Sequence, residues 1–244
     1  MKYFINLFLV LLVVIVAKVA WVMAKSDITV SSSQTFENLH IINHPLIDHK
    51  LTLMRDKRTS IALFKQSLSE IAMLMGYEVT KSLETKDVRI DTPITSMSAK
   101  KLKQQIVIVP ILRAGLGMAE GLEKLIPDSS MGHIGLYRDP KTKMPVEYLF
   151  KIPKITDQLF IVVDPMLATG NTAIYAVQKL ITAGVSPRKI VFMALVAAPE
   201  GVAKFASAHP TIKIYAAALD KKLDSHSYIV PGLGDAGDRL YGTK

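Results

Sequence analysis

The stretch Leu159-Phe-Ile-Val-Val-Asp-Pro-Met-Leu-Ala-Thr-Gly-Asn-Thr172 decides the fold of this chain. Its first five residues are all apolar, which is typical of a short strand that is buried on both faces of a sheet. A polar loop begins at Asp164, and apolar residues at helical spacing then predict a helix over residues 172–183. A buried strand, a loop and a helix in this order indicate one βα unit of an α/β fold.

The same alternation of strands and helices extends to both sides of this unit. The expected strands are residues 106–112, 133–138, 159–163, 190–197 and 212–216, and the expected helices are residues 45–54, 61–75, 117–125, 172–183 and 200–208. Gly76 is expected to end the second of these helices. The pattern predicts a mainly parallel sheet flanked by helices, in which ligands bind beyond the carboxyl ends of the strands. We therefore expect a site in the loops after Leu112, Arg138 and Val163.

Composition limits the classes of protein to which this chain can belong. Its 244 residues, half of them hydrophobic, suit one α/β domain with extensions and exclude an intrinsically disordered chain. The formal charge of +9 favours anionic partners, but no run of five basic residues predicts a nucleic-acid surface. The absence of cysteine excludes disulfides, thiolate metal sites and a cysteine nucleophile. The spacing of the six histidines does not predict a metal site.

Residues 1–25 differ from the rest of the chain, since an apolar run over residues 3–17 is followed by Lys18 and then by more apolar residues. The run has the length of the hydrophobic part of a signal peptide, and the whole segment approaches the ~20 residues that span a bilayer. Three interpretations stay open: a membrane anchor, a cleaved signal, and a leader upstream of the true start of the protein. Residues 35–244 are expected to form one domain.

The loop over residues 164–172 has the composition of a phosphate site. A glycine flanked by threonines where a helix begins offers backbone N–H groups, hydroxyl donors and the positive end of the helix dipole. Asp164, at the tip of the strand, is placed to accept hydrogen bonds from sugar hydroxyls. No Gly-Lys-Thr follows, so the loop is not a Walker P-loop. The alternative is an ordinary N-capped helix, with Thr169 or Thr172 as the cap.

This loop resembles the loop that binds phosphoribosyl pyrophosphate (PRPP) in type I phosphoribosyltransferases, and its form Asp-Pro-Met-Leu-Ala-Thr-Gly is similar to the uracil phosphoribosyltransferases in particular. Three further segments resemble the same family in the same order. They are Val-Pro-Ile-Leu-Arg-Ala-Gly-Leu-Gly at 109–117, Val-Ala-Ala-Pro-Glu-Gly at 196–201, and Tyr-Ile-Val-Pro-Gly-Leu-Gly-Asp-Ala-Gly-Asp at 228–238. The likeness extends from about His44 to Lys244. It departs at Asn171, where bacterial members usually carry glycine.

The resemblance implies transfer of the 5-phosphoribosyl group of PRPP to uracil, which gives UMP and pyrophosphate. It implies four catalytic residues, which are Arg113, Arg138, Asp164 and Asp235. The residues that it assigns to PRPP are Arg113, Arg138, Asp164, Pro165, Met166, Leu167, Ala168, Thr169, Gly170, Asn171, Thr172 and Asp235. The residues that it assigns to uracil, largely through backbone groups, are Ile229, Gly234, Asp235 and Ala236. Mg²⁺ is the expected cofactor, held mainly through PRPP and not by a dedicated set of protein ligands.

The resemblance also implies how the reaction runs. Uracil N1 displaces pyrophosphate at the anomeric carbon, with Arg113, Arg138 and Mg²⁺ stabilising the departing charge. Residues 139–153, which carry three prolines and three lysines, are a candidate for a flexible hairpin or flap that closes over PRPP, and the alternative is an ordinary exposed hairpin. A homo-oligomer, activation by GTP and a cytoplasmic location are further expectations from the family. If the leader is an anchor, the protein is tethered to a membrane through residues 3–24.

Two other functions remain open from the sequence. A non-catalytic protein of the same fold could sense PRPP or uracil, although the intact set of candidate catalytic residues argues against lost catalysis. An NAD-binding oxidoreductase is the other alternative, because Gly115, Gly117 and Gly121 open a helix after a strand in a dinucleotide-binding pattern. This second alternative leaves the loop over residues 164–172 unexplained.

Overall fold

The computed structural model of the chain describes residues 36–139 and 145–243. The helices are α2 (Pro45–Arg55), α3 (Ile61–Thr80), α4 (Leu116–Leu125), α5 (Asn171–Thr182), the 3₁₀ turn η1 (Pro187–Lys189), α6 (Pro199–Ala208) and α7 (Ala236–Tyr241). The strands are β1 (Leu39–Ile41), β2 (Thr85–Asp91), β3 (Ser96–Leu102), β4 (Ile106–Leu112), β5 (Ser130–Met131), β6 (His133–Arg138), β7 (Pro145–Lys151), β8 (Leu159–Val163), β9 (Met166–Leu167), β10 (Ile190–Ala197), β11 (Lys213–Leu219), β12 (Lys222–Leu223) and β13 (Ile229–Val230).

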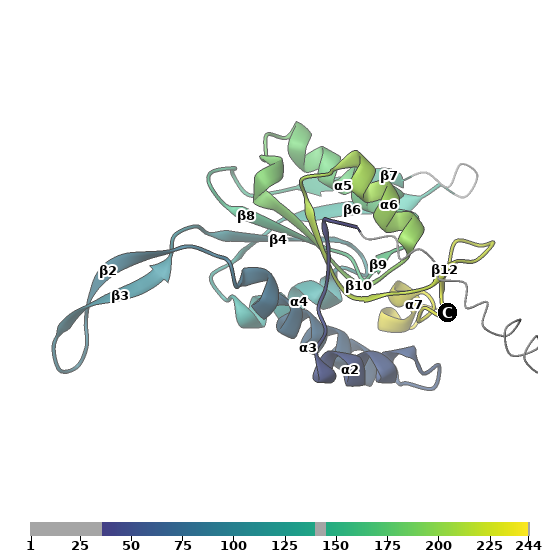
Figure 1. The fold of residues 1–244 in the computed structure, drawn as a ribbon, viewed down its shortest axis with the longest axis horizontal. Helices are drawn as coiled ribbons and strands as arrows, with labels where there is room; N and C mark the ends of the chain where they lie inside the picture. Colours follow the sequence, from purple (N-terminus) through teal and green to yellow (C-terminus); the bar gives the residue numbers. More distant parts are fainter. Residues whose placement is uncertain (1–35, 140–144, 244) are drawn as a thin grey trace, which may run out of the picture. The chain divides into compact units, whose positions relative to one another are not determined.

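The central sheet is built around β8, which lies between β4 and β10. Its strand order is β1-β11-β10-β8-β4-β6-β7, and the short strands β5 and β9 pair with β4 and β10. Within the described ranges, the pairings in this sheet are parallel except that of β6 with β7. Helices α5 and α6 lie on one face of the sheet, and α3 and α4 lie on the other (Figure 1). The predicted α/β fold, a mainly parallel sheet flanked by helices, is therefore confirmed.

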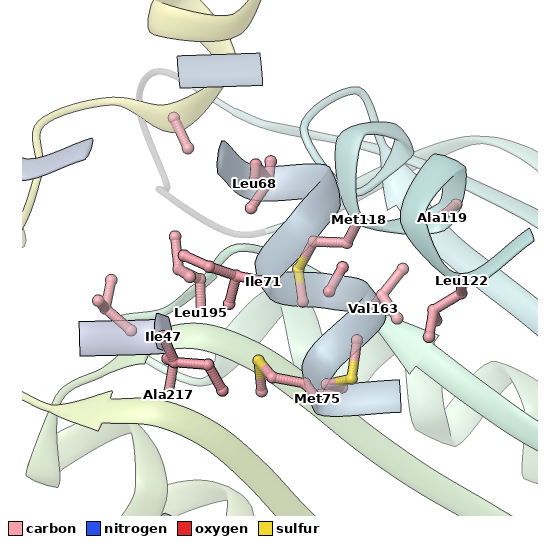
Figure 2. Packing of buried hydrophobic residues seen from close by; sticks show 14 of the residues in the cluster. Ile47, Leu68, Ile71, Met75, Met118, Ala119, Leu122, Val163, Leu195 and Ala217 are labelled. Carbon is pink, nitrogen blue, oxygen red and sulfur yellow. The ribbon is translucent and has the colours of Figure 1, made fainter. Parts of the chain in front are cut away.

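Two hydrophobic clusters, one for each face of the sheet, make up the core. The first includes residues of α2, α3 and α4, and Figure 2 shows Leu68, Ile71 and Met75 of α3 in the same cluster as Met118 and Leu122 of α4. The second includes residues of α5 and α6. Because β8 and β10 are buried along almost their whole length, the loops that follow them start from rigid positions.

The sequence predicted that helix α3 ends at Gly76, but the helix continues to Thr80. A Cβ atom at Gly76 would lie 2.5 Å from Leu122 Cδ2 and 3.0 Å from Leu125 Cδ2 on α4. The missing side chain therefore lets the two helices approach closely. This packing outweighs the roughly 1 kcal/mol that glycine costs in a helix relative to alanine. The prediction was wrong because it took a packing residue for a helix end.

The hairpin of β2 and β3 is a feature that the sequence did not predict. Its strands pair antiparallel, from Thr85 with Leu102 to Asp91 with Ser96, and form a sheet of their own. Most residues of both strands are exposed, and the hairpin extends away from the central sheet in Figure 1. The apolar alternation by which a strand is usually found is short here, since Val88 and Ile90 alternate in β2 and Met97 and Ala99 in β3 among mostly exposed polar residues.

Some of the expectations fall outside the described residues. The leader at residues 1–25, with its alternatives of anchor, signal and upstream start, is one of them, and the tip of the predicted flap at residues 140–144 is another. The rest of the flap segment contains β7, which runs antiparallel to β6. In the part of the chain that the structure describes, no helix is long and apolar enough to cross a membrane.

Candidate active site

A cavity of about 370 Å³ opens where β4, β6 and β8 end. Its walls come from the loops that follow these strands, from the start of α5 and from the segment around β13 and the start of α7. The lining residues are Ile111, Leu112, Arg113, Ala114, Leu136, Tyr137, Asp164, Met166, Leu167, Ala168, Gly170, Thr172, Ala173, His226, Ser227, Tyr228, Ile229, Gly234, Asp235, Ala236 and Gly237. The parallel sheet thus gathers segments that are far apart in the sequence at the expected edge.

The loop between β8 and α5 forms one wall of the cavity. Gly170 is the N-cap of α5, and its φ of +80° is a left-handed conformation that glycine adopts without strain. Ala168, Gly170 and Thr172 line the cavity, so the end of α5 that carries the N–H donors faces a ligand there. Asn171 instead contacts α6, where Lys204 Nζ donates to Asn171 Oδ1 at 2.5 Å. This wall has the composition and the helix end that a phosphate group needs.

Helix α6 supports the same loop from outside the cavity. A Cβ atom at Gly201 would lie 2.2 Å from Ala168 O and 2.8 Å from Leu167 O, so the absence of a side chain at Gly201 allows α6 to pack against the loop. Pro165 and Thr169, which the sequence assigned to PRPP, belong to this loop but are not among the described residues that line the cavity. Only some of the loop residues that were predicted to bind PRPP therefore line the cavity.

We expect a Gly201→Ala substitution to displace this loop and to weaken PRPP binding. The added methyl group would overlap with two carbonyl oxygens, and overpacking of this kind costs about 1–3 kcal/mol. The KM for PRPP should therefore rise by about 10-fold, as measured by steady-state kinetics. Ser207→Ala, an exposed change on the same helix, is the control and should leave this KM unchanged. An unchanged KM in Gly201→Ala would mean that the loop does not depend on the contact.

Asp164 lies directly after β8, half-buried in the wall of the cavity. Its Oδ1 accepts a hydrogen bond from Met166 N at 3.1 Å, and its own N–H donates to Met193 O at 3.2 Å. These bonds fix the carboxylate at the tip of the strand. An ionised carboxylate accepts up to about four hydrogen bonds, so this anchoring is compatible with a second role at sugar hydroxyls.

Arg113 follows β4 and lines the cavity with an exposed side chain. Tyr241 braces it, since Tyr241 Oη donates to Arg113 O at 3.1 Å and the guanidinium carbon lies 5.5 Å from the centre of the Tyr241 ring. Burial raises the pKa of Tyr241, nearby Glu120 also raises it, and Arg113 lowers it. The phenol therefore keeps the proton of this hydrogen bond at neutral pH, and the guanidinium is placed to bind an anion.

Arg138 is the last residue of β6, next to the cavity residues Leu136 and Tyr137. Its side chain lies outside what the structure describes, so its role stays a prediction from the sequence. Tyr137 was not predicted as a site residue. It is 53% exposed, and its ring centre lies 6.5 Å from that of Tyr148 on β7. An aromatic pair thus borders the cavity at the β6–β7 hairpin.

The segment around β13 and the start of α7 forms another wall. Ile229, Gly234, Asp235 and Ala236, the four residues that the sequence assigned to uracil, all line the cavity. Asp235 is also the N-cap of α7, where its Oδ1 accepts a hydrogen bond from Asp238 N at 2.9 Å. Asp235 therefore caps a helix and lines the cavity as well. The lining residues Gly234, Ala236 and Gly237 are small, so backbone groups of this wall can approach a flat, neutral ligand.

The turn before β13 also lines the cavity, although the sequence analysis assigned none of its residues to a ligand. His226, Ser227 and Tyr228 are the lining residues. Asp224 Oδ1 accepts hydrogen bonds from Tyr228 N and His226 N, each at 2.8 Å, and these bonds lower the pKa of Asp224. An aspartate often accepts a hydrogen bond from a backbone N–H two residues later, and this makes aspartate a common signal of a turn. Asp224 is therefore the signal by which the sequence could have indicated this segment.

The described residues of the cavity include carboxylates but no cluster of metal ligands. Among the described residues, no group of three or more His, Asp or Glu side chains could hold a metal ion. Asp164 and Asp235 both line the cavity. Mg²⁺ usually binds through one or two carboxylates together with waters and substrate phosphates. The donor set therefore fits a Mg²⁺ ion that is held mainly by a phosphorylated ligand.

The glycines of the alternative dinucleotide pattern have packing roles instead. A Cβ atom at Gly117 would lie 2.7 Å from Leu68 Cδ2, and one at Gly121 would lie 2.1 Å from Ser69 O. Both partners belong to α3, and neither glycine is among the described residues that line the cavity. These two glycines allow the close contact of α3 with α4, and Gly115 packs against the strands, since a Cβ atom there would lie 2.5 Å from Val163 O. The pattern therefore does not indicate a dinucleotide site.

Comparison with known proteins gives a consistent result. The model of the uracil phosphoribosyltransferase family matches residues 41–243. The uracil phosphoribosyltransferase of Rhodospirillum centenum is 58% identical over 210 residues, which cover 86% of this chain and 97% of that protein. The protein of the same name from Macrococcus caseolyticus is 57% identical over 208 residues, covering 84% and 99%. Among solved structures, the AQ2163 protein of Aquifex aeolicus has a TM-score of 0.79 at 32% identity, covering 84% of this chain and 99% of that one.

Proposed function

This chain belongs to the uracil phosphoribosyltransferase family, and on that premise we propose that its cavity is where the 5-phosphoribosyl group of PRPP passes to uracil, giving UMP and pyrophosphate. The chain is a pentosyl-transferring enzyme, and the oxidoreductase alternative is excluded. One observation carries the assignment of the site. The start of α5, Arg113, Ile229 and residues 234–236 all border one cavity.

PRPP is assigned to the part of the cavity that the β8–α5 loop and Arg113 border. The 5-phosphate would accept hydrogen bonds at the start of α5, from backbone N–H groups and Thr172. Asp164 would accept hydrogen bonds from the ribose hydroxyls. Arg113 and Arg138 would bind the pyrophosphate, because a guanidinium group can donate two parallel hydrogen bonds to phosphate oxygens. The anomeric carbon would then face the remaining wall.

Uracil is assigned to that remaining wall, beside Ile229, Gly234 and Ala236. The edge of uracil alternates carbonyl and N–H groups, so backbone N–H and carbonyl groups can recognise it without a charged side chain. Asp235, which also lines this wall, would help to hold Mg²⁺ that is bound to PRPP. The assignment places the base and the sugar in the same cavity, as direct transfer requires.

The transfer needs no covalent bond to the enzyme. Uracil N1 would form a bond to the anomeric carbon while the bond from that carbon to pyrophosphate breaks, and the N1 proton would pass to a hydrogen-bonded acceptor or to water. Catalysis would come from the positioning of both substrates and from stabilisation of the departing charge by Arg113 and Arg138. Phosphoribosyltransferases generally use Mg²⁺, which when bound neutralises part of the pyrophosphate charge.

Several expectations about partners stay predictions from the family. They are assembly into a homo-oligomer, activation by GTP and, for a tethered form, membrane contact through residues 3–24. Phosphoribosyltransferases use PRPP and a base, and a phosphorylated substrate of this kind belongs to the cytoplasm, where we place the reaction. A non-catalytic sensor of the same fold differs from this proposal in one measurable respect, since it binds PRPP without turnover.

Incubation of the full-length chain with PRPP, Mg²⁺ and one radiolabelled base at a time tests the proposed function. We expect UMP from uracil and no nucleotide from cytosine or hypoxanthine at the same enzyme concentration. PRPP binding without any nucleotide product would support the sensor instead. A nucleotide from hypoxanthine and none from uracil would contradict the assigned substrate.

A further inference from the structure

Gly232, within the segment assigned to uracil, is held by a buried ion pair. Arg55, the last residue of α2, contacts both carboxylate oxygens of Asp220, with Nη1 2.8 Å from Oδ2 and Nη2 2.6 Å from Oδ1. Arg55 Nη1 also donates to Gly232 O at 2.7 Å, and Gly232 N donates to Asp220 Oδ2 at 2.9 Å. Both backbone polar groups of Gly232 are thus bound by the same pair.

The ion pair of Arg55 and Asp220 is largely buried and is attached to the central sheet. The side chains of Asp220 and Arg55 are 5% and 25% exposed. Asp220 directly follows β11, and its N–H donates to Ala197 O at the end of β10, at 2.8 Å. A buried carboxylate is tolerated only when its oxygens have partners, and both oxygens of Asp220 accept hydrogen bonds here. The pair therefore joins the end of the sheet and the end of α2 to a single residue of the segment.

Arg239 of α7 makes a second contact of this kind at the next residue. Its Nη1 donates to Leu233 O at 2.9 Å and also to Met54 O, and its Nη2 donates to Asp56 O at 2.7 Å. Two guanidinium groups thus bind the carbonyls of the consecutive residues Gly232 and Leu233. Both groups connect these carbonyls to the carboxyl end of α2, because Arg55 is its last residue and Arg239 also binds the carbonyls of Met54 and Asp56.

Cavity residues lie on both sides of this anchored pair of residues. Ile229 comes before it, and Gly234 follows it directly. Gly232 has a φ of +60°, and a Cβ atom there would lie 2.1 Å from Ile229 O, so the turn between the two is closed tightly. Uracil is assigned to backbone groups of this segment, and no side-chain rotation can correct a backbone that has moved. Recognition of the base through this wall therefore depends on the position of Gly232.

We propose that Arg55 and Asp220 are positioning residues for the base subsite, because they hold Gly232 so that the backbone groups beyond it meet the edge of uracil. The inference rests on the proposed function, which takes residues 229–236 as the uracil wall. Neither side chain is among the described residues that line the cavity, so both act through the segment and not on a substrate.

Steady-state kinetics of the full-length chain, with uracil and PRPP varied separately, tests this role. Arg55→Gln and Asp220→Asn each remove one charge, and each should raise the KM for uracil on the order of 10- to 100-fold, since a small misplacement of binding groups has effects of this size. The KM for PRPP should stay at the wild-type value. Arg58→Gln is the matched control, because Arg58 carries the same charge near the same helix end and its side chain is 83% exposed. It should leave both KM values unchanged.

Arg55→Lys provides a milder variant in case a neutral one does not fold. A lysine keeps the buried charge pair, but a single ammonium group cannot reproduce the fork that contacts both Asp220 oxygens and Gly232 O. We expect it to fold and to raise the KM for uracil by about 10-fold, again without an effect on the KM for PRPP.

A purely structural role for the pair predicts a different result. Breaking a buried ion pair lowers stability, so the Tm and the fraction of active enzyme would fall while both KM values stay at the wild-type level. That outcome in the variants that fold overturns the inference and leaves the proposed function intact. Absence of UMP from the wild-type chain would instead overturn the proposed function, and this inference with it.

Discussion

Replacing Asp164 with asparagine should lower kcat/KM for PRPP on the order of 10³-fold, because two charge-assisted hydrogen bonds to the ribose hydroxyls of about 2 kcal/mol each would be lost. The fold should survive the change. The amide oxygen of asparagine can still accept the hydrogen bond that Asp164 Oδ1 now accepts from Met166 N at 3.1 Å. Initial rates of UMP formation at limiting PRPP provide the measurement.

Asp157→Asn is the matched control for this prediction. Asp157 lies just before β8, at the opposite end of the strand from Asp164, and its carboxylate is 79% exposed beside Lys189. The two variants make the same chemical change at the two ends of one strand. If Asp164→Asn were as active as Asp157→Asn, the assignment of Asp164 to the ribose would be wrong.

Arg113→Met should lower kcat by about 10²–10³-fold, the usual effect of removing one preorganised group that stabilises developing charge. Arg113 lines the cavity, and its guanidinium is assigned to the departing pyrophosphate. Methionine keeps much of the length of the side chain, and Tyr241 Oη bonds to the backbone of residue 113, which the substitution does not alter. The KM for uracil should therefore remain unchanged.

The measurement for Arg113 is a full kinetic analysis with Arg188→Met as the control. Arg188 is an exposed arginine of η1, so its substitution removes the same charge away from the cavity. Wild-type turnover in Arg113→Met would exclude this residue from the reaction. A rise in the KM for uracil with unchanged kcat would assign it to the base and not to pyrophosphate.

The fold was predictable where burial leaves a continuous apolar pattern. β4, β8 and β10 have the bounds that the sequence predicted, because a strand buried on both faces is apolar at nearly every position. The β2–β3 hairpin was missed for the opposite reason, since most of its residues are exposed. Gly76 misled the prediction because a glycine that ends a helix and one that packs against another helix look the same in a sequence.

The candidate site was predictable as far as its parts are local. The loop from Asp164 to Thr172 is a continuous segment, and its composition is compatible with a phosphate site as well as with an ordinary N-capped helix. The contact between Arg55 and Asp220 joins residues that are 165 positions apart, and neither position carries a local pattern that selects it. Residues that support a site from behind are found only when the fold has brought them together.

A crystal structure of the full-length chain with UMP bound tests the central claim most directly. The claim is that the phosphate and the base occupy two walls of the same cavity. It predicts the UMP phosphate within hydrogen-bond distance of the start of α5, at Gly170 and Thr172, and the edge of uracil against the backbone of Gly234 and Ala236. UMP bound outside this cavity, or bound with its phosphate against Gly234 and Ala236, would contradict the account.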